Sequence, residues 1–112
     1  MIDRPDVIVE LLKDFGIVPY SRGGSLFVEF VMRCAIFRHS HPLDKTGSGA
    51  VFRLMAHEHN MFYRGLEAII KSAIKPLMFA SPDRLWKYGL SPEKRTVCGL
   101  AWDVCGLLQW WD

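Results

Sequence analysis

The chain has 112 residues, half of them apolar and 23% charged, and a formal net charge of +2. This length suits a single globular domain, residues 1–112, that buries its own core. The composition excludes a disordered chain. The three cysteines form no CxxC pair, which argues against a disulfide framework and for a reducing compartment.

The charge is unevenly distributed along the chain. Residues 1–19 carry a net charge of −2, residues 20–75 a net charge of +4, and the remainder balances. A basic middle segment suits a modest electrostatic contact with nucleic acid. A mixed, solvated surface is the more frequent origin of such a pattern, so charge alone does not decide between them.

The first part of the chain predicts two helices. Ile8, Leu11, Leu12 and Phe15 recur at the i, i+3, i+4, i+7 spacing of an amphipathic helix, and Gly16 is a stop signal. A second helix is expected after the loop marked by Pro19, Gly23 and Gly24. Its predicted apolar face is Leu26, Phe27, Phe30, Val31, Cys34 and Ala35.

The second part predicts the remaining helices and no strand. Turn-forming residues indicate a loop over 39–49, followed by a helix over Val51–His59 and another over Tyr63–Lys75, where Pro76 ends or kinks it. Two Ser-Pro pairs, at Ser81 and Ser91, predict helix starts. The expected fold class is all-α, with about six helices.

Residues 56–75, AHEHNMFYRGLEAIIKSAIK, look like two helices that meet at a tight turn, as in a helix-turn-helix. The outer face of the second helix carries Arg64, Glu67, Lys71 and Lys75. Glu67 and Lys71 stand four residues apart in the order that favours an ion pair. Any helical hairpin with a solvated face shows the same pattern, so the residues alone leave DNA binding and a plain helical domain open.

Three segments carry a resemblance to a known family: LLKDFGIVPYSRGGSLFVEFV, VFRLMAHEHN and GLEAIIKSAI, with SPEKRTVCGLAWDV as a fainter fourth. Together they resemble the C-terminal effector domain of the sporulation-initiation response regulator of endospore-forming bacteria. That family is an all-helical DNA-binding domain. The resemblance therefore implies a helix-turn-helix, double-stranded DNA as partner, and a role in transcription control.

The likeness is weakest at the residues that would contact bases. A pair of family threonines is replaced by Met61 and Phe62, and two family arginines by Gly65 and Ala68. Arginine is the commonest side chain that recognises guanine, so base readout is largely lost while the scaffold is kept. The residues expected at DNA, mostly on phosphates, are Arg22, Arg53, Arg64, Glu67, Lys71 and Lys75. The alternative is a protein-interaction or dimerisation module on the same fold.

Other functional classes find little support. His39, His41, His57 and His59 form two His-x-His pairs, but residues two apart on a helix face different ways, so surface histidines are expected and no metal. No spacing suggests a catalytic set, so we expect neither an enzyme nor a cofactor.

The C-terminal segment is almost entirely apolar. Its run Val97–Trp111 is interrupted by Asp103 and Gln109 and is too short to span a bilayer. Because the first twenty residues do not resemble a signal peptide, we expect a soluble, cytoplasmic protein. A helix that is apolar all round is usually buried. We therefore expect a homodimer interface anchored by Trp102, Trp110 and Trp111, with a central core helix as the alternative.

Overall fold

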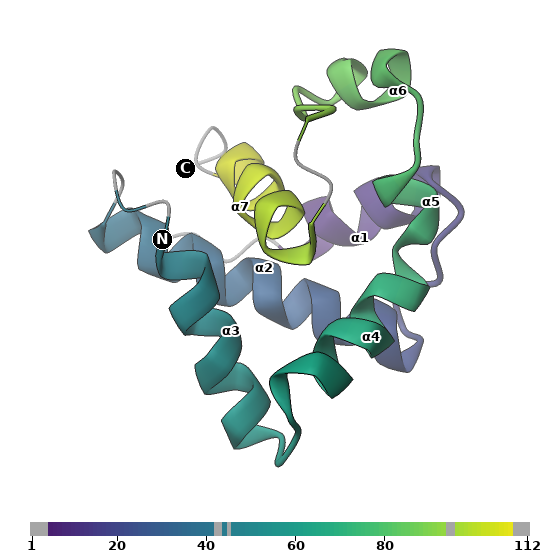
Figure 1. Cartoon of the computed structure of the whole chain (residues 1–112). Coiled ribbons are helices and arrows are strands. Elements are labelled where there is room, and N and C mark those ends of the chain that lie inside the picture. The colour runs from purple at the N-terminus through teal and green to yellow at the C-terminus, as the bar shows by residue number, and fades with distance from the viewer. Residues whose placement is uncertain (1–4, 42–43, 45, 94–95, 109–112) are drawn as a thin grey trace.

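The computed structural model describes residues 5–41, 44, 46–93 and 96–108. Over these residues the chain forms seven helices and no strand, which confirms the predicted all-α class (Figure 1). The helices are α1 (Pro5–Asp14), α2 (Arg22–Ser40), α3 (Gly47–Glu58), α4 (Tyr63–Ala73), α5 (Lys75–Met78), α6 (Pro82–Lys87) and α7 (Val97–Leu108).

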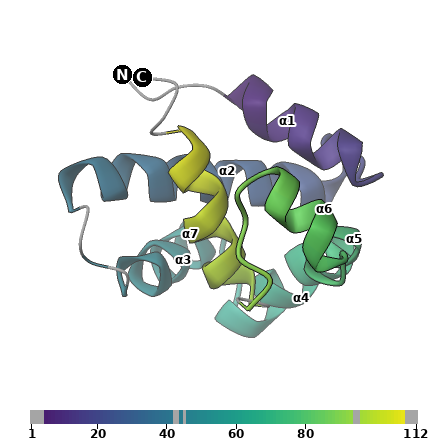
Figure 2. The same ribbon diagram turned by 90° about the horizontal axis from the view of Figure 1, so that it is seen from above.

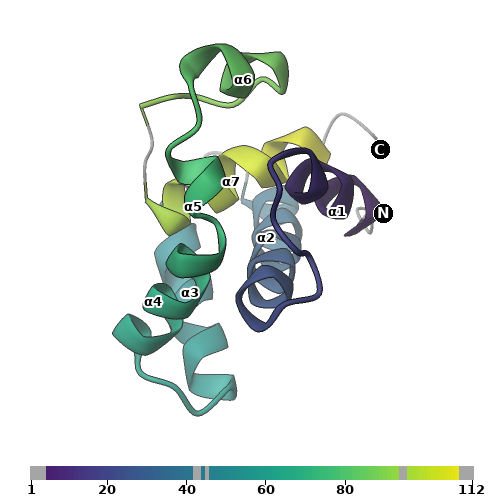
Figure 3. The same ribbon diagram turned by 90° about the vertical axis from the view of Figure 1, so that its right-hand side faces the viewer.

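The long helix α2 lies at the centre and packs against α1, α3, α4 and α7. Its N-terminus is capped by Ser21, whose Oγ accepts a hydrogen bond from the backbone N–H of Gly24 at 3.1 Å. The predicted apolar face is confirmed, since every member is buried; Phe27, Phe30, Val31, Cys34 and Ala35 are fully enclosed. In two perpendicular views α1 and α4 lie on opposite sides of α2 (Figures 2 and 3).

The loop predicted over residues 39–49 is shorter than expected, because helices enter it from both ends. Helix α2 continues to Ser40 and α3 already begins at Gly47. The sequence predicts Gly47 to lie in the loop, whereas it is the first residue of α3. A Cβ placed on it would lie 1.9 Å from Cε1 of Phe37, so the glycine allows α3 to approach the ring of Phe37 closely.

The last helix begins later than the Ser-Pro pair predicted. Ser91 forms only a local turn, in which its Oγ accepts a hydrogen bond from the N–H of Glu93 at 3.3 Å. Helix α7 starts at Val97, after Thr96, whose Oγ1 accepts from the N–H of Gly99 at 3.0 Å as a capping hydroxyl does. At Pro76 the prediction is confirmed, because α4 ends at Ala73 and the proline sits in the first turn of the separate helix α5.

Two glycines differ sharply in their surroundings. A Cβ on Gly23 would lie 2.5 Å from Cβ of Ala73 and 2.6 Å from the carbonyl oxygen of Ile69, so α2 and α4 touch there. A Cβ on Gly65, in the first turn of α4, would meet no atom within 4 Å.

We therefore expect opposite effects on stability from two identical substitutions. Gly23→Ala should lower the free energy of unfolding by about 1–3 kcal/mol, since the backbone of α4 must move away. Gly65→Ala should raise it by about 0.5–1 kcal/mol through helix propensity. Urea denaturation of both variants measures this, and a Gly23→Ala variant as stable as the wild type would contradict the close contact of α2 with α4.

Candidate nucleic-acid interface on α4

The outward face of α4 combines cations with small residues. Its buried side is formed by Leu66 and Ile70, which are fully enclosed, and is continued by Ile74. The exposed positions of the helix and of the residue that begins α5 lie on the opposite side. They are Arg64, Gly65, Ala68, Lys71, Ser72 and Lys75. This face has three positive charges, no carboxylate, and small side chains that let a partner approach closely.

Most cations of the described chain either have a partner or lie near α4. Arg33 and Lys13 are in ion pairs, while Arg38 and Arg84 donate hydrogen bonds to backbone carbonyls. The described lysines and arginines that have neither an ion pair nor a hydrogen bond to a backbone carbonyl are Arg22, Arg53, Arg64, Lys71, Lys75 and Lys87. All but Lys87 belong to the set that the sequence predicts at DNA.

Arg22 and Arg53 come from helices that pack against α4. Arg22 is exposed at the start of α2, next to Gly23, which touches the C-terminal half of α4. Arg53 is exposed on α3, with its guanidinium carbon 6.0 Å from the centre of the Tyr63 ring at the start of α4. The fold therefore brings one additional arginine towards each end of the basic face.

Glu67 lies at the edge of this face and not on it. Its side chain is half-buried, and its charge contributes to raising the pKa values of Tyr63 and Cys98. Burial is the main cause for both groups and raises the pKa of Tyr63 to about 12. The ion pair with Lys71 that the spacing favours does not form between these two described residues. Glu67 is therefore less accessible to a partner than the exposed cations of this face.

The start of α4 lacks a capping side chain. Phe62 occupies the N-cap position, makes no side-chain hydrogen bond, and is 91% exposed. Met61, the other replaced residue, is partly buried against the core. The first turn of α4 thus carries the exposed Arg64 and follows an exposed aromatic ring.

A charged network that the sequence analysis missed holds the α3–α4 connection against α2. Arg33 contacts Glu29 at 3.0 Å through Nε and Glu58 at 2.8 Å through Nη1, and His59 Nε2 lies 3.0 Å from Glu29 Oε1. The Arg33 hydrogen bond is the main cause that lowers the pKa of Glu58. Glu29 and Arg33, four apart on a helix, were a recognisable signal; Glu58 and His59 join them only through the tertiary fold.

Trp102, one of the three predicted interface residues, is buried within the chain itself and is only 4% exposed. The guanidinium carbon of Arg38 lies 4.9 Å from the centre of its indole ring, and Nη1 of Arg38 donates to the Trp102 carbonyl at 2.8 Å. These contacts make Trp102 a core residue of the α2–α7 packing, which corrects its assignment to an interface. Trp110 and Trp111 lie outside the described residues.

Metal-ligating side chains, thiols and apolar helices are the features of the described chain that bear on the other functional classes. No group of three His, Cys, Asp or Glu side chains there is arranged to hold a metal ion. Cys34, Cys98 and Cys105 are free thiols, and burial raises the pKa of each. Among the same residues, no helix has the length and apolar character needed to cross a membrane.

Comparisons with protein-family models, with curated proteins and with solved structures found no significant match to this chain.

The Arg33 network generates a pH-dependent prediction. A carboxyl whose pKa is lowered by folding stabilises the fold above its unfolded pKa, about 4.3 for Glu, and this contribution is lost as the pH falls through its folded pKa. Arg33→Gln should therefore have a lower free energy of unfolding than the wild type at neutral pH. This difference between the two proteins should shrink as the pH falls from the unfolded pKa of Glu58 through its folded pKa.

Urea midpoints measured from acid to neutral pH test this. Lys13→Gln is a suitable control, because its pair with Glu10 is long, at 3.8 Å, and both side chains are more than half exposed. A difference in urea midpoint between Arg33→Gln and the wild type that does not change with pH would contradict the role given to Glu58.

Proposed function

We propose that this chain is a helix-turn-helix domain that binds double-stranded DNA mainly through its phosphates. The observation that carries the proposal is the basic face of α4, which is exposed, free of carboxylates and flanked by Arg22 and Arg53. A surface of this kind attracts the phosphate backbone by releasing counterions.

The connection between α3 and α4 supports the helix-turn-helix assignment. Only residues 59–62 separate the two helices, and Asn60 adopts a left-handed conformation with φ of 54°, as a tight turn between helices requires. Helix α4 buries Leu66 and Ile70 and leaves its opposite side open. A recognition helix needs this division, because one face must reach the major groove.

The composition of the face favours phosphate contacts over base recognition. Gly65 and Ala68 occupy central exposed positions and have no polar atoms for base edges, and Glu67 is half-buried. Lys71 and Lys75 interact with phosphate as point charges and carry little sequence information. We therefore expect weak sequence preference, and we base the role in transcription control on the resemblance to the sporulation regulator's effector domain.

Lys71→Ala should weaken binding to all duplex sequences about equally. The magnitude of the slope of log K against log salt should fall by about one, because each phosphate contact contributes about −0.9. Fluorescence anisotropy of labelled duplexes of different sequence, titrated at several salt concentrations, measures both quantities. Lys13→Ala is the matched control, since Lys13 belongs to α1 and α1 lies across α2 from α4 (Figures 2 and 3).

Two results would contradict the DNA proposal. One is the absence of duplex binding at low salt. The other is an equal loss of affinity in Lys71→Ala and Lys13→Ala, which would show that only net charge matters.

A protein-interaction module is the second candidate, and the exposure of Phe62 favours it. An aromatic ring that is 91% exposed at the start of α4 suits a protein partner, since aromatic residues are frequent binding anchors. The discriminating variant is Phe62→Ser. It should leave phosphate-driven DNA binding unchanged but remove binding to a protein that uses this end of α4.

We further propose a homodimer that involves Trp110 and Trp111. Tryptophan is a favoured anchor at protein interfaces, and a two-fold dimer would pair two DNA-binding helices. Sedimentation equilibrium should show a dimer for the wild type and a monomer for Trp110→Ala combined with Trp111→Ala. A wild type that stays monomeric at high micromolar concentration would contradict the dimer.

A further inference from the structure

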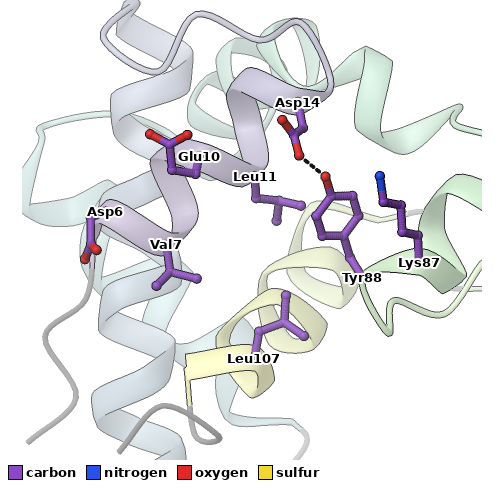
Figure 4. A pocket seen from close by; sticks show the side chains of 8 residues that line it. All are labelled: Asp6, Val7, Glu10, Leu11, Asp14, Lys87, Tyr88 and Leu107. Atoms are coloured by element: carbon purple, nitrogen blue, oxygen red, sulfur yellow. Dashed lines mark hydrogen bonds between the residues drawn. The ribbon is translucent and has the colours of Figure 1, made fainter.

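A hollow of about 460 Å³ lies between α1, the end of α6 and α7. Its inner wall is apolar. Figure 4 shows Leu11 of α1 and Leu107 of α7 pointing towards the same space, with Val7 and the ring of Tyr88 beside them. The hydroxyl of Tyr88 donates a hydrogen bond to the carboxylate of Asp14, which ties α1 to the segment after α6. The volume is in the range that binding sites occupy.

The side of the hollow formed by α1 is acidic. Asp6, Glu10 and Asp14 line it, and they recur every fourth residue, so they follow one another along the helix axis at intervals of about 6 Å. Among the described residues that line the hollow, Lys87 is the only positive side chain, and Lys13 of α1 forms a long ion pair of 3.8 Å with Glu10. The ammonium nitrogen of Lys87 lies 5.8 Å from the centre of the Tyr88 ring.

This pattern is complementary to an amphipathic helix with basic residues. Basic side chains four apart on a partner helix repeat at the same interval of about 6 Å as the three carboxylates. The apolar side chains between them would enter the space lined by Val7, Leu11 and Leu107, as in other complexes in which a helix occupies a groove.

We propose that the hollow beside α1 is a docking surface for a basic amphipathic helix of a partner protein. The apolar wall binds the partner's aliphatic side chains, and Glu10 and Asp14 pair with its lysines or arginines. Lys87 opposes such a partner, because it places a like charge at the same edge.

This surface is separate from the proposed DNA interface. Helix α1 lies across α2 from α4 (Figures 2 and 3), and none of the residues that line the hollow belongs to the basic face of α4. Failure of DNA binding therefore leaves this proposal intact, and the full chain can be tested for each activity in turn.

The probe is a synthetic leucine–lysine helix of about 14 residues, close to four turns, with its lysines four apart; a glutamate version serves as the matched peptide. Fluorescence anisotropy at physiological salt should show that the protein binds the lysine peptide saturably and does not bind the glutamate peptide. Glu10→Lys should weaken this binding about tenfold, and Lys87→Ala should strengthen it about threefold, because the two changes alter the charge at the rim in opposite senses.

The control variant is Glu93→Lys, which makes the same charge change at an exposed residue outside the hollow. The Glu10 side chain is 74% exposed, so Glu10→Lys should keep the wild-type circular dichroism spectrum. Equal weakening by Glu10→Lys and Glu93→Lys would overturn the proposal, as would no binding of the lysine peptide. Self-association of the chain that Glu10→Lys abolishes would also overturn it, because the occupant would then be a second copy.

Discussion

The structure depends on the enclosure of α2 by four other helices. Phe27, Phe30 and Val31 are fully buried along its length, and burial of such side chains is the dominant favourable term in folding. At the N-terminal end, Gly23 lets the backbones of α2 and α4 touch. This contact orients α4 so that Leu66 and Ile70 face the core and the basic residues face outward. The exposure of the basic face therefore depends on how α4 packs against α2, although α2 itself supplies only Arg22 to the set of cations.

The helical class, the apolar faces and the break at Pro76 could be predicted from the sequence because each has a local cause. Spacing of apolar residues and the missing N–H of proline act within a few residues. The start of α3 was predicted too late because Gly47 is required by the distant ring of Phe37. Trp102 was misassigned for a similar reason, since Arg38 and Phe37 enclose it from α2.

The same distinction applies to the candidate site. The cations of α4 were predictable, because amphipathic spacing alone places Arg64, Lys71 and Lys75 outside. The half-burial of Glu67 was not, because it arises only in the folded chain, where the charge of Glu67 contributes to raising the pKa values of Tyr63 and of Cys98 of α7. The hollow beside α1 was also unpredictable, because Leu107 and Tyr88 meet Leu11 only in the folded chain. Local patterns thus identify surfaces, and tertiary contacts decide which residues of a surface are available.

The central claim is that the outward face of α4 binds the phosphates of duplex DNA. Chemical-shift mapping of the ¹⁵N-labelled protein with a short duplex at low salt tests it most directly. The claim predicts that the largest shifts fall on Arg64, Ala68 and Lys71, extend to Arg53, and disappear on addition of salt. Shifts confined to α1 or to Phe62, or no shifts at low salt, would contradict it.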